Sequence, residues 1–188
     1  MNLVALLYKV AVLDWSLGRL DNKVVSRLLL ALSILAALGC SDAMSPDDYS
    51  HAWRQSVADY KKIDKDPNDP AANPDGNSDG SIQSRSAAAS YISQQIRDIA
   101  TSIKDLKAPP QYARLQDETY IFYRGQADEY QGYAQALGTG NPDKIDAAGN
   151  GINNFVDEHV QTITGVIDKL GNDSSRFRPA WVGILKNH

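Results

Sequence analysis

The segment from residue 66 to residue 81 carries the densest set of oxygen ligands in the chain. It reads DPNDPAANPDGNSDGS and consists mostly of Asp, Asn, Pro and Gly. An EF-hand loop binds calcium through oxygens at positions 1, 3, 5, 7 and 9, with Gly at position 6 for a sharp turn. Counted from Asp75, the segment matches the first half of that pattern. The predicted calcium ligands are Asp75, Asn77, Asp79, the backbone carbonyl of Ser81, and Gln83.

Two features of this loop depart from an EF-hand. Ser86 stands at position 12, where a bidentate Glu is expected, and no helix leads directly into the loop. Asp66 or Asp69 could fold over to complete the shell. Because Asp, Asn and Gly are also the residues of ordinary turns, a plain polar connector is the alternative. If the loop binds calcium, the expected Kd is about 10⁻⁴–10⁻³ M, as in extracellular modules.

Cys40 is the only cysteine, and only Gly39 separates it from an apolar run from Leu28 to Leu38. A single cysteine excludes an internal disulfide and any metal motif that needs two cysteines. The run is shorter than the ~20 residues that span a bilayer. Arg27 precedes it, and small residues follow it. A positive charge, a short apolar core and small residues are the pattern of a secretory signal.

The residues Ala37, Leu38, Gly39 and Cys40 resemble the lipobox of bacterial lipoprotein precursors. The resemblance implies cleavage before Cys40 and diacylation of its thiol. Acyl chains contribute about 0.8 kcal/mol per buried CH₂, so two or three of them anchor a protein firmly. Ser41, in place of the Asp that retains many such proteins in the inner membrane, implies the outer membrane, facing the periplasm. A buried helix with a chance cysteine is the alternative.

The chain is therefore expected to begin with a signal segment, residues 1–39, followed by an anchor and short linker, residues 40–45. Residues 1–23 fit a signal segment badly. A translation start assigned too far upstream explains them, and a genuine N-terminal helix is the rival explanation. Residues 46–171 form the expected folded domain with a long loop at 65–81, and residues 172–188 a tail or short helix.

Four amphipathic segments in this domain predict an all-α, antiparallel up-down four-helix bundle. The predicted helices cover residues 46–64, 82–107, 110–137 and 142–170. Ser45 and Asn141 are expected N-caps, each followed by Pro at the first helical position. The stretch LKAPPQYARLQ resembles small uncharacterised bacterial lipoprotein bundles, in which Pro-Pro-x-Tyr opens a helix.

No catalytic constellation is found in the sequence. The serines lack a G-x-S-x-G context, and the short GTG and GNG stretches are not phosphate loops. The chain carries 19 basic and 23 acidic side chains, a balance that argues against nucleic acid as a partner because phosphate binding needs a basic face. We therefore expect a protein without catalytic activity.

His159 lies on the apolar seam of the last predicted helix, where a bundle can hold haem or another metal. Met44 and His51 are the conceivable second ligands. At about 1.5 Å per residue, His159 lies about 18 Å from its helix end and His51 about 7 Å from its own. These heights do not match in antiparallel neighbours, so a hydrogen-bonded histidine at the edge of the core is the favoured interpretation.

Tyrosine is common in protein interfaces, because it combines apolar area with a hydrogen-bonding tip. The third helix is rich in it, and the predicted contact surface is Tyr120, Tyr123 and Tyr130. The C-terminal tail is expected either to touch a membrane surface or, preferably, to pack on the bundle as a short helix starting near Pro179. The leading hypothesis is a lipid-anchored periplasmic bundle that binds an envelope component or a secreted protein. A calcium-binding module and a haem- or metal-binding bundle are the alternatives.

Overall fold

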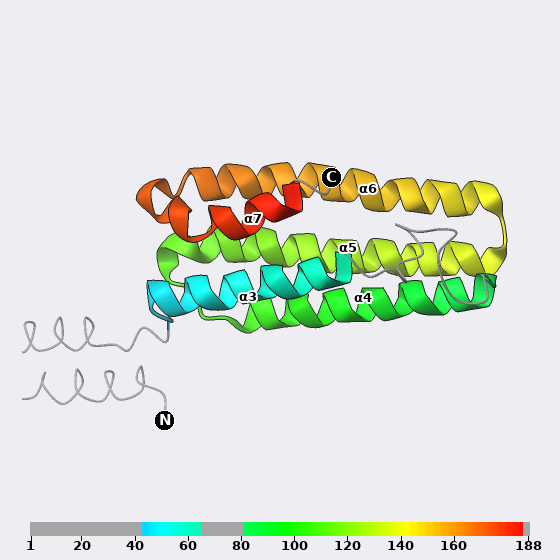
Figure 1. The fold of residues 1–188 in the computed structure, drawn as a ribbon, viewed down its shortest axis with the longest axis horizontal. Helices are drawn as coiled ribbons and strands as arrows, with labels where there is room; N and C mark the ends of the chain where they lie inside the picture. The colour runs from blue at the N-terminus through cyan, green and yellow to red at the C-terminus, as the bar shows by residue number, and fades with distance from the viewer. Residues whose placement is uncertain (1–42, 65–80, 186–188) are drawn as a thin grey trace, which may run out of the picture. The chain divides into compact units, whose positions relative to one another are not determined.

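The structure, a computed structural model, describes residues 43–64 and 81–185. These residues belong to one structural unit that begins at Ala43. Within the described ranges the chain forms helices and no strand, so the predicted all-α class is confirmed. Figure 1 shows that the helices from residues 46–64, 82–105, 113–139 and 142–168 run antiparallel to their chain neighbours, with a short helix at the C-terminal end.

The first described helix, α3 (Pro46–Asp64), begins and ends where the sequence predicts. The Ser45 hydroxyl accepts a hydrogen bond from the Asp48 backbone N–H at 3.1 Å, so Ser45 caps the helix. Asp47 and Asp48 occupy the first turn, where the helix dipole favours negative charge. The apolar stripe of α3 is buried along its length.

The second helix, α4 (Ile82–Asp105), is capped by Ser81 and ends just before the predicted 107. A 3₁₀ turn, η2 (Pro110–Tyr112), then leads into α5 (Ala113–Thr139). The predicted third helix therefore opens with a tighter turn after Pro109 and Pro110. Gly140 follows α5 with φ +65°, a left-handed conformation that glycine adopts without strain.

The fourth helix, α6 (Pro142–Asp168), starts at the predicted residue, and the Asn141 side chain accepts a hydrogen bond from the Lys144 N–H. After it, the chain forms the 3₁₀ helix η3 (Gly171–Arg176) and the short helix α7 (Arg178–Leu185). Phe177, Trp181 and Ile184 are buried in the core. The prediction that the tail packs back on the bundle is confirmed.

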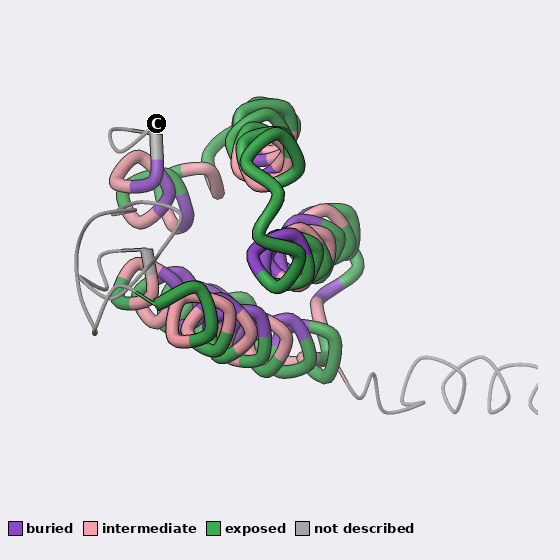
Figure 2. Tube along the Cα trace, turned by 90° about the vertical axis from the view of Figure 1, so that its right-hand side faces the viewer, coloured by how far each residue is buried: buried purple, intermediate pink, exposed green. Residues whose placement is uncertain are grey.

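The helix α7 changes the expected bundle. It contacts both α3 and α6, and both views place it between them (Figures 1 and 2). α4 packs on α5 and on α3, and α5 packs on α6. One side of the bundle is therefore closed by a fifth, short helix, which a four-helix prediction does not include.

Because α3 and α7 are short, they cover only one end of the longer helices (Figure 1). We call this end, with α3, η2, η3 and α7 around residues 96–105, 113–123 and 155–168, the five-helix half. The other end, residues 82–93, 127–139 and 142–152, is the three-helix half. None of the described helices is both long and apolar enough to cross a bilayer.

Candidate interaction site between α3 and α4

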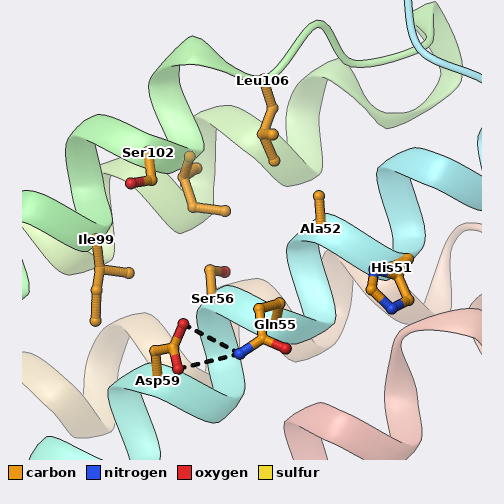
Figure 3. A pocket seen from close by; sticks show the side chains of 9 residues that line it. His51, Ala52, Gln55, Ser56, Asp59, Ile99, Ser102 and Leu106 are labelled. Atoms are coloured by element: carbon orange, nitrogen blue, oxygen red, sulfur yellow. Dashed lines mark hydrogen bonds between the residues drawn. The ribbon is translucent and has the colours of Figure 1, made fainter.

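A groove of about 330 Å³ lies between α3 and α4 on the five-helix half (Figure 3). One wall comes from α4 and the residue that follows it: Ile103 is buried, and Ile99 and Leu106 are half-buried. The other wall comes from α3 and is mostly polar. The lining residues are His51, Ala52, Gln55, Ser56, Asp59, Ile99, Ser102, Ile103 and Leu106.

The polar wall of the groove carries one ordered carboxylate, Asp59. Gln55 donates to its two oxygens at 3.1 and 3.2 Å, as the dashed lines in Figure 3 show. The Lys62 ammonium donates to it at 2.7 Å. The hydrogen bond from Lys62 lowers the pKa of Asp59. The groove therefore presents an ionised carboxylate at neutral pH, paired with the Lys62 ammonium.

The hydroxyl groups of the groove are engaged with the helix backbone. Ser56 donates to the Trp53 carbonyl at 2.7 Å, and Ser102 donates to the Asp98 carbonyl at 3.0 Å. His51 is exposed at the rim. The groove therefore combines an apolar wall with a carboxylate that can accept further hydrogen bonds, which suits an apolar side chain next to a hydrogen-bond donor in a bound segment.

The predicted tyrosine surface is wrong for two of its three members. Tyr123 and Tyr130 are only 0% and 6% exposed, so neither offers contact area. Tyr123 packs against Tyr60 and Phe122, with ring centroids 5.2 and 5.3 Å apart. Tyr120 is half-buried, and the Lys104 ammonium lies 5.5 Å from its ring centre.

The reason is that α5 is packed by both α4 and α6, so its buried face is wider than a single stripe. The groove residues were not predicted as a site. Ile99 and Leu106 read as part of the apolar seam of α4, and no local signal in the sequence marks where α3 leaves that seam uncovered.

Only two of the predicted calcium ligands lie in the described part of the chain. The Ser81 side chain accepts from the Ser84 N–H, and its carbonyl accepts from the Arg85 N–H at 3.1 Å. Gln83 is exposed in the first turn of α4. The Ser86 hydroxyl donates to the Ala134 carbonyl of α5 at 2.8 Å, so position 12 is directed toward the bundle.

Asp75, Asn77 and Asp79 lie outside the described residues, as does Cys40. Among the residues that the structure does describe, no group of three or more His, Cys, Asp or Glu side chains is placed to hold a metal ion. The calcium loop and the lipid anchor stay predictions.

His159 makes the contacts of a structural histidine. Its Nδ1 lies 3.0 Å from the Phe155 carbonyl oxygen, and its ring stacks on the Phe155 ring at 3.9 Å between centroids. The side chain is half-buried. The interpretation as a hydrogen-bonded histidine at the edge of the core is confirmed. The Met44 N–H donates to the Lys107 carbonyl at 2.8 Å, which fixes the chain just before α3.

Comparison with known proteins gives no match: no family model fits the chain, and no curated protein or solved structure is similar enough to place it in a family. The resemblance to lipoprotein precursors thus rests on the residues around Cys40. That segment and the geometry of the bundle are the features that bear on function.

Proposed function

We propose that this chain is a lipid-anchored protein of the bacterial envelope that has no catalytic activity and binds a protein partner. Cys40 carries the acyl chains, and the outer membrane, facing the periplasm, is the proposed location. The partner is an envelope component or a secreted protein. The groove between α3 and α4 is the observation that carries the binding function.

The groove supports binding of a peptide segment in two ways. Its apolar wall offers Ile99 and Leu106 as half-buried contact area beside the buried Ile103. Its polar wall holds the Asp59 carboxylate in place through Gln55 and Lys62. Interfaces gain most of their affinity from apolar anchors, while charged groups at the edge select the partner. The expected partner segment therefore has an apolar side chain followed closely by a side chain that donates a hydrogen bond to Asp59.

The fixed start of the bundle supports the role of the anchor. Met44 is held to Lys107, and Cys40 lies four positions before it. A chain spans at most about 3.6 Å per residue, so the tether reaches about 14 Å. In an acylated protein the five-helix half, which begins at Met44, would then lie beside the bilayer. The groove would open on the flank of that half, within reach of other membrane-attached proteins.

The anchor is tested by labelling cells that express the full chain with a radioactive fatty acid. We expect label on the wild type and none on Cys40→Ser, with Ser41→Ala as the matched control that keeps its label. A wild-type protein that keeps its leading residues and a free thiol, as measured by mass spectrometry, would contradict the proposal.

Binding is tested by photocrosslinking in intact cell envelopes. A photoreactive residue at Gln55 or Ser102 lies in the groove, and one at Asp157 lies on the exposed face of α6. We expect one adduct of the same mass from both groove positions, none from Asp157, and loss of the adduct in Ile99→Glu. Circular dichroism checks that Ile99→Glu is folded. Adducts that form equally from Asp157, or no adduct at all, would remove the groove as the binding site.

A calcium-binding module is the second candidate, favoured by the spacing of Asp75, Asn77 and Asp79 before the Ser81 cap of α4. Calcium there would fix the loop to the start of α4 and raise the melting temperature. Thermal melts with excess Ca²⁺ and with chelator test this, with Asp79→Asn as the variant and Asp98→Asn as the control on an exposed face. Equal midpoints in the two conditions would remove this candidate.

A further inference from the structure

A second pocket, of about 320 Å³, lies in the three-helix half where α4, α5 and α6 meet. Its polar lining is Arg85 from α4, Tyr133 from α5, and Asp146, Asn150 and Asn153 from α6, with Gly149 between them. Neither the tyrosine prediction nor the calcium loop includes this set. The residues come from three helices, and Arg85 and Tyr133 are 48 positions apart.

Arg85 is the unusual member of this pocket. Its side chain is half-buried, and its Nη2 donates to the Tyr133 hydroxyl at 3.2 Å. Its Nε is buried and has no hydrogen-bond partner. No carboxylate in the described part of the chain forms an ion pair with it. A partly buried guanidinium without a counter-charge is destabilising, and an anion that accepts its hydrogen bonds would offset that cost.

The α6 side of the pocket supplies the opposite charge. Asp146 is exposed and pairs with no described lysine or arginine. Asn150 and Asn153 offer amide donors and acceptors one and two turns further along α6. A Cβ at Gly149 would lie 3.7 Å from the Tyr133 ring, which is ordinary contact distance, so an alanine would fit there. A longer side chain at residue 149 would enter the pocket.

We propose that this pocket binds a small zwitterion, an amino acid or a dipeptide. The carboxylate of the ligand pairs with Arg85, the ammonium group pairs with Asp146, and the two asparagines hydrogen-bond to the groups between them. Arginine holds a carboxylate through two parallel N–H donors, a geometry that its two Nη atoms provide. A single basic residue among the lining side chains argues against a phosphate ester. The proposal does not depend on the lipid anchor or on the groove.

Calorimetric titration of the purified full chain with L-alanyl-L-alanine tests the proposal. We expect saturable binding of the dipeptide and binding about tenfold or more weaker for acetate and for ethylammonium, which each keep one charge. Arg85→Gln is expected to weaken the dipeptide about 10- to 100-fold. Arg97→Gln, on the same helix but paired with Asp128, is the control and should bind like the wild type.

Two further variants test separately the role of the Asp146 charge and the shape of the pocket. Asp146→Asn should lower dipeptide affinity to the level of acetate and leave acetate unchanged, with Asp143→Asn as its control. Gly149→Leu should block both ligands in a protein that remains helical by circular dichroism. Absence of dipeptide binding at millimolar concentration in the wild type would overturn the proposal. So would equal affinity for dipeptide and acetate, or an Arg85→Gln variant that binds like the wild type.

Discussion

The two halves of the bundle fill their interiors with different kinds of side chain. The five-helix half is packed with large rings, and the largest fully buried side chains are Trp53, Trp181, Tyr49, Tyr60, Tyr112, Tyr123, Phe122 and Phe177. The three-helix half uses Ala89, Ala127, Ala134 and Ala136 beside a few larger residues. Five elements around an interior leave a wide space that only large side chains fill to native density, whereas three helices approach closely over small residues.

The buried polar groups of the two halves differ in charge. In the five-helix half, the two indole N–H groups find neutral partners: Trp53 donates to Thr119 at 3.0 Å and Trp181 to Thr164 at 3.1 Å. The buried Tyr49 hydroxyl of that half has no partner, and neither has the buried Nε of the charged Arg85 in the three-helix half. The five-helix half presents its groove on the outside, between two of its helices. The three-helix half has the charged side chains Arg85 and Asp146 in its pocket, where we propose that a small ligand binds.

The largest expected effect that tests this contrast concerns the buried aromatic rings of the five-helix half, which we call the ring cluster. Trp181 is 1% exposed and lies 5.9 Å from Trp53 and 5.7 Å from Phe122, ring centre to ring centre. Trp181→Ala should lower the free energy of unfolding by about 3–5 kcal/mol, measured by urea denaturation. In the three-helix half, Ile152→Ala should lower it by only about 2–3 kcal/mol, because three helices close more easily over a cavity. A larger loss for Ile152→Ala would break the comparison.

A smaller effect is expected where α5 and α6 approach each other between the two halves. A Cβ on Gly125 would overlap the end of the Phe155 ring, so the ring or the helix would have to move. Gly125→Ala should therefore destabilise the protein by about 1–3 kcal/mol in the same assay.

Gly132, on the same helix, is the matched control for that substitution. It is exposed, and nothing lies within 4 Å of its added Cβ. Gly132→Ala should stabilise the protein by about 0.5–1 kcal/mol through helix propensity. The same sign for both glycines would mean that the helices are not in close contact at Phe155.

These sites show what could be predicted from the sequence. The start of a helix is determined locally. Ser45 and Asn141 predict two helix starts correctly, because each side chain accepts a hydrogen bond from the backbone N–H three residues further on. The closure of the bundle by α7 is not local, because its contacts with α3 join residues more than one hundred positions apart. Periodicity shows that Trp181 and Ile184 are apolar on one face but not which helices they will meet.

The functional residues were harder to predict for the same reason. In the sequence, the tyrosines of the third helix occupy more than one helical face, so a single apolar stripe does not account for all of them. Tyr123 and Tyr130 are buried because α5 packs on two neighbouring helices. To predict the groove, one must know the relative position of α3 and α4. To predict the Arg85 pocket, one must know how three helices pack together. His159 was interpretable because its hydrogen bond is made within its own helix, to Phe155.

Alkaline pH should weaken the five-helix half in particular. Burial raises the pKa of both Tyr49 and Tyr123 above its usual value of about 10. In the folded state these hydroxyls keep their protons, whereas in the unfolded state they lose them near pH 10. Their contribution to the free energy of unfolding is thus complete below about pH 10. It falls by about 1.4 kcal/mol per group per pH unit as the pH rises toward the pKa of the folded state.

The variant Tyr49→Phe isolates this loss. Urea unfolding between about pH 9 and pH 11 should show that the free energy of unfolding declines less steeply for Tyr49→Phe than for the wild type. The difference in slope is the contribution of one tyrosine hydroxyl. Val57→Ala, also in the core of α3, controls for a general loss of stability and should keep the wild-type slope. Parallel curves for Tyr49→Phe and the wild type would show that this hydroxyl already titrates normally in the folded protein.

The smallest effect separates hydrogen bonding from packing inside the ring cluster. Tyr49 and Tyr112 stack with ring centroids 5.5 Å apart, but only the Tyr112 hydroxyl is paired, donating to Asp173 at 2.8 Å, whereas the buried Tyr49 hydroxyl has no partner. At neutral pH, Tyr112→Phe should therefore lose about 1 kcal/mol of unfolding free energy, and Tyr49→Phe should be neutral or slightly stabilising. Combining Tyr112→Phe with Asp173→Asn should lose little more than the larger of the two single changes, because both remove the same bond. If Tyr49→Phe were instead the costlier change, the rings of the five-helix half would be held by their hydroxyls, and the contrast with the three-helix half would lie in polar pairing and not in the volume to be filled.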